Sequence, residues 1–257
     1  MKTLMLNNHE VRLYDSIDEL PIVNFQKYNK YLLIDSGIGS DIEDFDAHIT
    51  KLAKYIQQDR ALAIQELKNM RQNLAMIISE ISPKHLAFAA LIYSIDNEVI
   101  TDFSDEGLRA LLGKLAELKQ SKLAEILEGI KKKVSIELEL YFPKEFIDAK
   151  QKEVYDKLKQ RVIYELREII EDQEYSQQLE EIDTWLFNLY KPQSFEGQES
   201  AEIKYDKHFE ASCLLIAQKS SLNPRNMTVL QFYGALETIK KQLEAEAKMY
   251  KKSSNKC

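Results

Sequence analysis

The stretch Ser82-Pro83-Lys84-His85-Leu86-Ala87-Phe88-Ala89-Ala90-Leu91-Ile92 decides the fold. Serine followed by proline indicates a helix start. Serine caps the first turn, and proline is tolerated at the first helical position because a backbone N–H there would have no acceptor within the helix. The run from Leu86 to Ile92 is apolar on every side. A helix without a polar face is buried, so this segment predicts a central helix around which the other elements pack. We expect His85, in its first turn, to be a cap or surface residue rather than a base.

Outward from this segment, apolar residues recur at steps of three and four, which is the period of an amphipathic helix. Glycine and proline are scarce, with seven and five in 257 residues, so long helices with short connections are expected. Ser40, with Glu43 three residues later, predicts a capped helix start. The predicted helices cover about 21–35, 40–56, 61–81, 82–92, 104–118, 121–142, 144–171, 175–189, 203–219 and 228–250.

Two short segments have strand character instead. Residues 4–14 predict a β-hairpin with its turn at Asn7-Asn8, and residues 92–101 predict a second one with its turn at Asp96-Asn97. The predicted fold class is therefore mainly α: an irregular multi-helix bundle with one or two small β-hairpins.

Residues 191–202 form the predicted linker, since they contain Pro192, Gly197 and several polar side chains. The predicted organisation is an N-terminal hairpin plus main helical domain over 1–190, the linker, a C-terminal helical pair over 203–250 and a flexible tail over 251–257. Whether residues 203–250 pack on the main domain is left open by the sequence.

Composition narrows the functional classes. The formal net charge is −7, and 44% of the residues are hydrophobic, as in an ordinary folded domain. An acidic chain does not favour nucleic-acid binding, which needs a basic face, although a local basic patch stays possible. Cys213 and Cys257 predict no stabilising disulfide and hence a reducing, cytoplasmic setting. No apolar run reaches the roughly 20 residues that span a bilayer, and we expect no export signal or membrane partner.

The sequence contains few patterns that suggest chemistry. His48 follows Asp44 by four residues on one predicted helix, so the two could bind a metal together; the favoured interpretation is an exposed, charge-rich helix start. Gly37 and Gly39 precede that helix and could form an anion cradle, but a tight helix–helix turn is favoured. We predict no catalytic, cofactor-binding or metal-binding residue and no cofactor. A helical enzyme with a carboxylate site, built from Asp35, Asp41, Asp44 and His48, is the weaker alternative.

Interface residues are predicted at two places. A hairpin is marginal alone and can pack on a partner or add strands to a neighbour's sheet. Tyr190 and Phe195, at the edge of the linker, are candidates for exposed aromatic residues of an interface, although local packing is the favoured alternative. Trp185 is expected in the core. The candidate interface residues are Leu4, Leu6, Val11, Leu13, Tyr14, Tyr190 and Phe195.

Two stretches carry a resemblance to a known group of proteins. One comprises Asp18–Ile22, Phe25, Lys27–Leu32 and Ile34–Asp41, and the other is Met227–Glu237. They resemble segments of helical structural or assembly proteins of tailed bacteriophages, such as those of the crAss-like group. The resemblance implies a head–tail connector or tail component, or a tail-assembly factor, that contacts other virion proteins, often in a symmetric ring. It implies no catalytic residue.

The sequence thus predicts a non-enzymatic structural or interaction protein that acts through protein–protein interfaces. We expect a homo-oligomer that also contacts other virion or assembly proteins. The expected location is the cytoplasm of the host cell during assembly, and the virion if the protein is retained. A nucleic-acid-associated regulatory helical protein is the second hypothesis.

Overall fold

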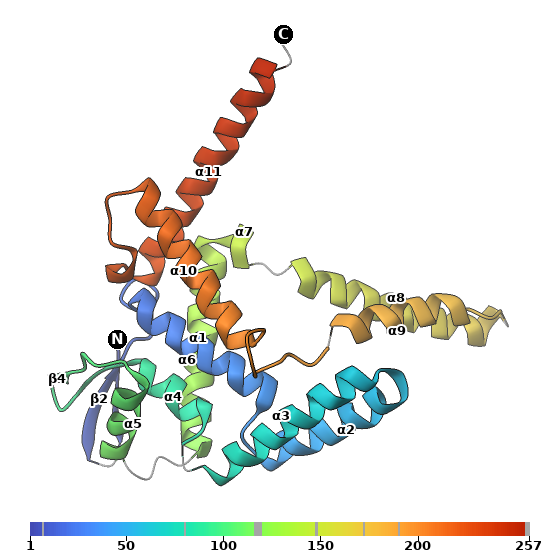
Figure 1. Cartoon of the computed structure of the whole chain (residues 1–257), viewed down its shortest axis with the longest axis horizontal. Coiled ribbons are helices and arrows are strands. Elements are labelled where there is room, and N and C mark those ends of the chain that lie inside the picture. Colours follow the sequence, from blue (N-terminus) through green and yellow to red (C-terminus); the bar gives the residue numbers. More distant parts are fainter. Residues whose placement is uncertain are drawn as a thin grey trace.

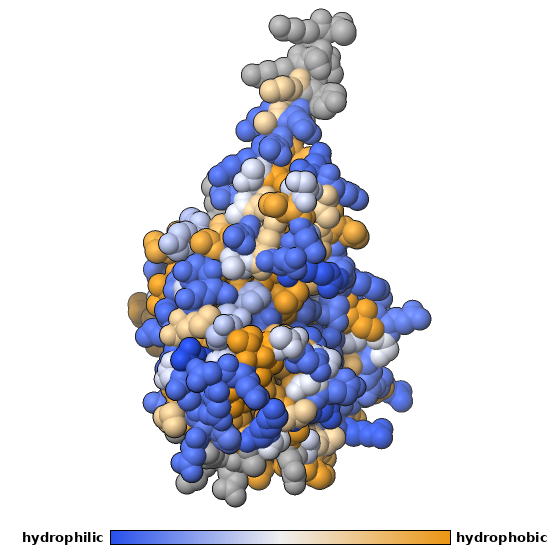
Figure 2. Space-filling view, turned by 90° about the vertical axis from the view of Figure 1, so that its left-hand side faces the viewer, coloured by the Kyte–Doolittle hydropathy of each residue, from blue (hydrophilic) through white to orange (hydrophobic). Residues whose placement is uncertain are grey.

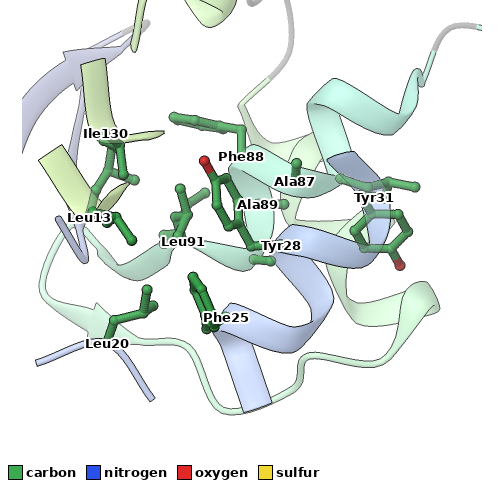
Figure 3. Close-up of a cluster of buried hydrophobic side chains, with 14 of the residues drawn as sticks. Leu13, Leu20, Phe25, Tyr28, Tyr31, Ala87, Phe88, Ala89, Leu91 and Ile130 are labelled. Carbon is green, nitrogen blue, oxygen red and sulfur yellow. The ribbon is translucent and has the colours of Figure 1, made fainter. Parts of the chain in front are cut away.

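The predicted central helix is present. In the computed structural model, which describes residues 1–6, 8–79, 81–115, 120–146, 149–171, 173–189 and 191–254, helix α4 spans Pro83–Ala90. The Ser82 N–H donates to Nδ1 of His85 at 3.2 Å, so His85 is a cap, as predicted. Ala87–Leu91 are fully buried. Figure 3 shows Tyr28 lying against Phe88, Ala89 and Leu91 at the centre of the core. The helix ends two residues earlier than predicted because Ile92 begins a strand.

Helices make up most of the remaining structure, which confirms the mainly α fold class. Around α4 lie α1, α5 and α6, and the C-terminal helices pack beside α1 (Figure 1). The helices are α1 (Ile22–Ile38), α2 (Ile42–Gln58), α3 (Arg60–Ile78), α4 (Pro83–Ala90), α5 (Asp105–Lys114), α6 (Gln120–Tyr141), α7 (Pro143–Phe146), α8 (Ala149–Glu171), α9 (Ser176–Leu189), α10 (Ala201–Lys219), η1 (Pro224–Asn226) and α11 (Val229–Ser254).

Both predicted hairpins form, and they join into one antiparallel sheet. The strands β1 (Lys2–Leu6), β2 (His9–Leu13), β3 (Ile92–Ile95) and β4 (Glu98–Val99) lie in the order β1-β2-β3-β4. Asp96 and Asn97 have φ of 48° and 67°, the left-handed pair that a tight type I′ hairpin turn requires. The sequence did not predict the pairing of β2 with β3, in which Val11 lies opposite Ile95.

The start of α2 differs from the prediction by one residue. Asp41 is the cap instead of Ser40, and Asp44 completes the capping box instead of Glu43. The Asp44 N–H donates to Asp41 Oδ1 at 2.9 Å, and the Ser40 N–H donates to Asp44 Oδ2 at 2.8 Å. Gly39 has φ of 71°, so the chain leaves α1 in a left-handed turn that a side chain would disfavour.

The C-terminal helices pack on the main body. Ile216, Val229 and Phe232 belong to the same buried cluster as Leu20 and Phe25. The Ile22 N–H donates to the Met227 carbonyl, and the Val229 N–H donates to the Leu20 carbonyl, each at 2.9 Å. Residues on both sides of the predicted linker therefore share one core.

Two helical hairpins project from the body on the side away from the sheet (Figure 1). We call α2–α3 the first arm and α8–α9 the second arm. The C-terminal part of α11 extends away from the body in a third direction (Figure 1). Figure 2 shows the side that carries the sheet, where hydrophilic residues are interspersed with apolar patches. Among the described residues, no helix combines the length and the apolar character needed to cross a membrane.

Candidate interaction surfaces

The apolar side chains of the first hairpin face this chain's own core. Leu6, Val11 and Leu13 are buried, and Leu4 and Tyr14 are half-buried against them. The Tyr14 ring contacts the Tyr93 ring edge-on, with centroids 5.5 Å apart. These five candidate interface residues therefore stabilise the body, and a partner can reach the hairpin mainly through its backbone edge.

Strand β1 provides that edge, since it is the terminal strand of the sheet. Leu6 lies opposite His9 across the tight turn, and Leu4 lies opposite Val11. In an antiparallel ladder the residues that close the turn bond to the partner strand, and the bonding alternates along the strand. The N–H and C=O groups of Thr3 and Met5 therefore point outward, where a further strand can bind.

Phe195 is buried, so its place among the interface candidates is wrong and the alternative of local packing is confirmed. Its side chain is 7% exposed, and its ring packs on Gly37. A Cβ at position 37 would lie 2.3 Å from the ring, so the close approach requires glycine. Gly37 thus belongs to α1 as a packing residue, and α1 continues past the predicted end at residue 35. Tyr190, the other predicted aromatic, lies outside the described residues.

The predicted linker is fixed along α3. The Asn69 side chain donates to the Gln193 carbonyl at 3.1 Å, and the Gln72 side chain donates to Glu196 Oε1 at 3.3 Å. These bonds, with the buried Phe195, place the segment between the base of the first arm and α10. Sequence composition indicated a connection here but gave no sign of its contacts.

His48 occupies a buried polar cluster at the base of the first arm, and the prediction of an exposed position is wrong. Its Nδ1 lies 2.7 Å from Glu66 Oε1, and its Nε2 lies 2.8 Å from the Ile38 carbonyl oxygen. With Glu66 ionised, both neighbours are acceptors, and this arrangement suits the imidazolium form, in which both ring nitrogens donate. Accordingly, the hydrogen bond with Glu66 raises the pKa of His48, and the bond to Ile38 adds to the effect.

The same cluster fixes the end of α1. The Asn73 side chain donates to the Ile38 carbonyl at 3.0 Å, beside His48. A carbonyl at a helix C-terminus has no intrahelical partner and lies at the negative end of the dipole, so a cation and an amide donor both stabilise it. The cluster therefore joins α1, α2 and α3.

The carboxylates considered for metal binding are used within the chain. Asp41 and Asp44 cap α2, and the Lys84 ammonium lies 3.7 Å from Asp35 and 3.6 Å from Asp41. Burial raises the pKa of the Asp35 carboxyl. Across the described residues, no group of three or more side chains has an arrangement that could hold a metal ion.

Two of the hollows on the body lie beside residues discussed above or are lined by aromatic rings. One, of about 220 Å³, lies beside Glu66 at the base of the first arm and is lined mainly by polar side chains, including Lys51 and Asn69. The other, of about 300 Å³, is lined by aromatic rings of α1, α7, α10 and α11, including Tyr28 and Tyr233. Burial raises the pKa of both tyrosines, so they stay neutral hydroxyls.

The first arm exposes a row of large apolar side chains. Its helices meet through small and polar residues, including Ala63, Glu66 and Asn73, which are buried. The outer row of α2, which we call the α2 stripe, contains exposed isoleucines and half-buried residues between them. On α3, Ile78 is 83% exposed. The α2 stripe consists of Ile42, Phe45, Ile49, Leu52 and Ile56.

The second arm also exposes apolar side chains while polar residues lie between its helices, and to a greater degree. Polar contacts run along the seam of α8 and α9: Arg161 donates to Asp183 at 2.7 Å, and Glu168 accepts from the Tyr175 N–H at 2.8 Å. The rings of Tyr164 and Tyr175 also meet there, with centroids 5.3 Å apart, and Ile182 of α9 is buried. Of the α8 side chains that the structure describes, over 153–171, none is buried. The apolar row, which we call the α8 stripe, is exposed throughout, with Ile169 80% exposed. It consists of Tyr155, Leu158, Val162, Leu166 and Ile169.

The recurrence of apolar residues at steps of three and four predicted amphipathic helices here, but it could not tell that most of these apolar side chains stay exposed in the described chain. Comparisons with protein-family models, with curated proteins and with solved structures give no match for this chain. The functional argument therefore depends on the surfaces themselves.

Proposed function

We propose that this protein is a non-enzymatic structural or interaction protein that acts through protein–protein interfaces. Following the resemblance of its two stretches, we propose a component of the head–tail connector or tail of a phage particle, or a factor in tail assembly. The observation that carries the interface role is the exposure of apolar stripes on two arms that project from the body.

The free-energy cost of leaving large apolar side chains in water supports this interpretation. Burying one large aliphatic side chain is worth about 1.5–3 kcal/mol, and extended exposed apolar surfaces usually mark contact sites. Ile78, Ile169 and Ile170 are each about four-fifths exposed, although the chain has enough apolar residues to build a large core. Side chains that contribute little to the fold of one chain can contribute to its contacts with another.

The open edge of β1 offers a second kind of contact. Its outward N–H and C=O groups at Thr3 and Met5 suit the addition of a strand, and Met5 is exposed on the face away from the core. Lys2 is the charged residue that natural edge strands often carry to limit uncontrolled pairing.

The interface role can be tested by size-exclusion chromatography with light scattering. The chain is run alone, mixed with lysate of its native source, and as the double variant Ile49→Gln/Val162→Gln. We expect a mass above the monomer or a shift into a larger assembly, and a reduced effect in the variant. A monomer that no lysate component shifts would contradict the proposal.

The phage role needs a separate measurement. Mass spectrometry of purified particles from the native source would detect a retained virion component. Detection in assembly intermediates but not in finished particles would favour an assembly factor, and detection in neither would contradict both roles.

A further inference from the structure

We infer that α8 is the interface through which two copies of this chain pair, with their α8 helices side by side and antiparallel. This inference rests on the proposed interface function and identifies one partner as a second copy. Its basis is the α8 stripe, whose spacing and surrounding charges both suit a twofold pair.

The stripe lies on a face of α8 that α9 leaves open. At about 100° per residue, Tyr155, Leu158, Val162, Leu166 and Ile169 fall within an arc of about 80°. The half-buried residues that face α9, such as Arg161, Tyr164 and Glu168, fall on the neighbouring arc. A second helix can therefore bind the stripe while α9 stays in place.

The spacing of the stripe is symmetric about its centre. The successive steps are three, four, four and three residues, so each member has a mate at the same distance on the other side of Val162. A twofold axis between antiparallel helices pairs residues in this way. With the axis at Val162, Tyr155 meets Ile169 of the second copy and Leu158 meets its Leu166.

Spacing alone does not exclude the α2 stripe. Four of its members, Ile42, Phe45, Ile49 and Leu52, are also spaced symmetrically, about the midpoint between Phe45 and Ile49. Phe45 and Leu52 are, however, half-buried within the chain, whereas all five members of the α8 stripe are exposed. The α8 stripe is therefore the better candidate for self-pairing.

Charge selects the antiparallel direction. Within α8, five basic and two acidic residues precede Val162, and one basic and three acidic residues follow it. A parallel pair would place like halves beside each other, and an antiparallel pair places the basic half beside the acidic half. Ile163 and Ile170, on the side away from α9, extend the apolar surface.

The contact is short. From Tyr155 to Ile169 the stripe covers about 21 Å of helix, which lies at the small end of specific interfaces. We therefore expect a concentration-dependent equilibrium between monomer and dimer, with a dissociation constant on the order of micromolar.

A charge-swap experiment at the proposed axis tests the pairing. Val162→Glu and Val162→Lys each place like charges against each other in the dimer, whereas their equimolar mixture places unlike charges there. In sedimentation velocity we expect each variant alone to be monomeric at concentrations where the natural chain is dimeric, and the mixture to recover the dimer. Val162 is half exposed, so thermal unfolding monitored by circular dichroism should be unchanged at a concentration where the natural chain is monomeric.

Ile49→Glu, on the α2 stripe, is the matched control and should leave the dimer intact. The inference is overturned if both Val162 variants dimerise like the natural chain, if their mixture stays monomeric, or if Ile49→Glu is the change that abolishes the dimer.

Disulfide trapping tests the direction. In a Cys257→Ser background, in which the remaining Cys213 is buried, Tyr155→Cys should cross-link with Ile169→Cys and not with itself. Self-cross-linking of Tyr155→Cys without the mixed product would show a parallel pair and contradict the antiparallel arrangement.

The two proposals fail in different ways. If the chain is monomeric alone but joins a larger assembly with lysate, the pairing is wrong and the interface function stands. If it dimerises through another surface, the same conclusion holds. If it is monomeric and joins nothing, both are wrong.

Discussion

The first arm is fastened to the body by a buried charged cluster, whereas the ion pairs between the helices of the second arm are exposed to water. His48 and Glu66 are almost fully buried and reach the last carbonyl of α1. Arg161 pairs with Asp183 and Glu165, all substantially exposed. The α8 stripe is exposed and the α2 stripe is exposed or half-buried, so neither arm depends mainly on its apolar stripe for its own seam.

This difference shows what each arm contributes. A buried pair fixes geometry, because its partners cannot separate without leaving an uncompensated charge. Exposed pairs contribute about 0–1 kcal/mol and hold two helices loosely. The first arm is therefore placed firmly relative to α1, and the second arm is suited to gain order from whatever binds its uncovered face.

The largest expected effect comes from cutting the buried pair. Glu66→Gln removes the carboxylate beside His48, and we expect the free energy of unfolding to fall by about 3 kcal/mol. Asp183→Asn, the matched change in the second arm, should cost no more than about 1 kcal/mol. Urea unfolding monitored by circular dichroism measures both. Equal losses would refute the contrast between the arms.

A second test concerns the segment that holds the base of the first arm. Gly37→Ala puts a methyl group into the Phe195 ring, and we expect a loss of about 1–3 kcal/mol. Gly129→Ala lies within α6 with no atom near the new methyl group, so it should stabilise the chain by about 0.5–1 kcal/mol. Thermal unfolding of the two variants should therefore shift in opposite directions. A stabilising Gly37→Ala would show that the ring moves freely.

The buried histidine predicts a specific pH dependence. The pKa of His48 in the folded chain lies above 6.5, the ordinary value that applies in the unfolded chain. Between pH 6.5 and the folded-state pKa, the folded chain therefore binds more protons than the unfolded chain. The stabilisation is complete below pH 6.5 and is lost as pH rises through the folded-state pKa, by at most about 1.4 kcal/mol per pH unit.

Urea titrations at several pH values measure this slope, and His48→Gln should flatten it. A natural chain that gains stability over the same range would indicate a neutral histidine and contradict the hydrogen-bond assignment.

The smallest effects are expected on the stripes. Ile49→Gln and Leu166→Gln change exposed or half-exposed positions that the fold of one chain uses little, so each should alter the free energy of unfolding by no more than about 0.5 kcal/mol. Chemical denaturation at a concentration that keeps the chain monomeric is the measurement. A loss above about 2 kcal/mol in either variant would mean that the stripe is covered within the chain.

Sequence patterns predicted the elements whose causes are local. The cap at Ser82, the turn at Asp96-Asn97 and the 3.6-residue spacing each act within a few residues, and each appears in the structure. The pairing of β2 with β3 and the packing of Phe195 on Gly37 depend on residues far apart in the chain. No local pattern encodes them.

The polar cluster at His48 is another contact that local sequence patterns do not encode. Its partner Glu66 lies on the next helix, and Ile38 contributes only a carbonyl that every residue possesses. Spacing on one helix suggested Asp44 as the neighbour, because a single helix face is all that periodicity describes. The candidate stripes were visible in the sequence, but which helix covers which face depends on the assembled fold.

The presence of two separate apolar arms on one body also sets the valency of the molecule. A twofold contact between two α8 helices buries the α8 stripe of both chains, so no third chain can bind there. Pairing through α8 alone therefore ends at a dimer. Each chain of the pair keeps the α2 stripe of its first arm, so the pair has two equivalent attachment points. The direction of the first arm relative to the α8 axis then decides whether further growth closes into a ring or continues as a filament.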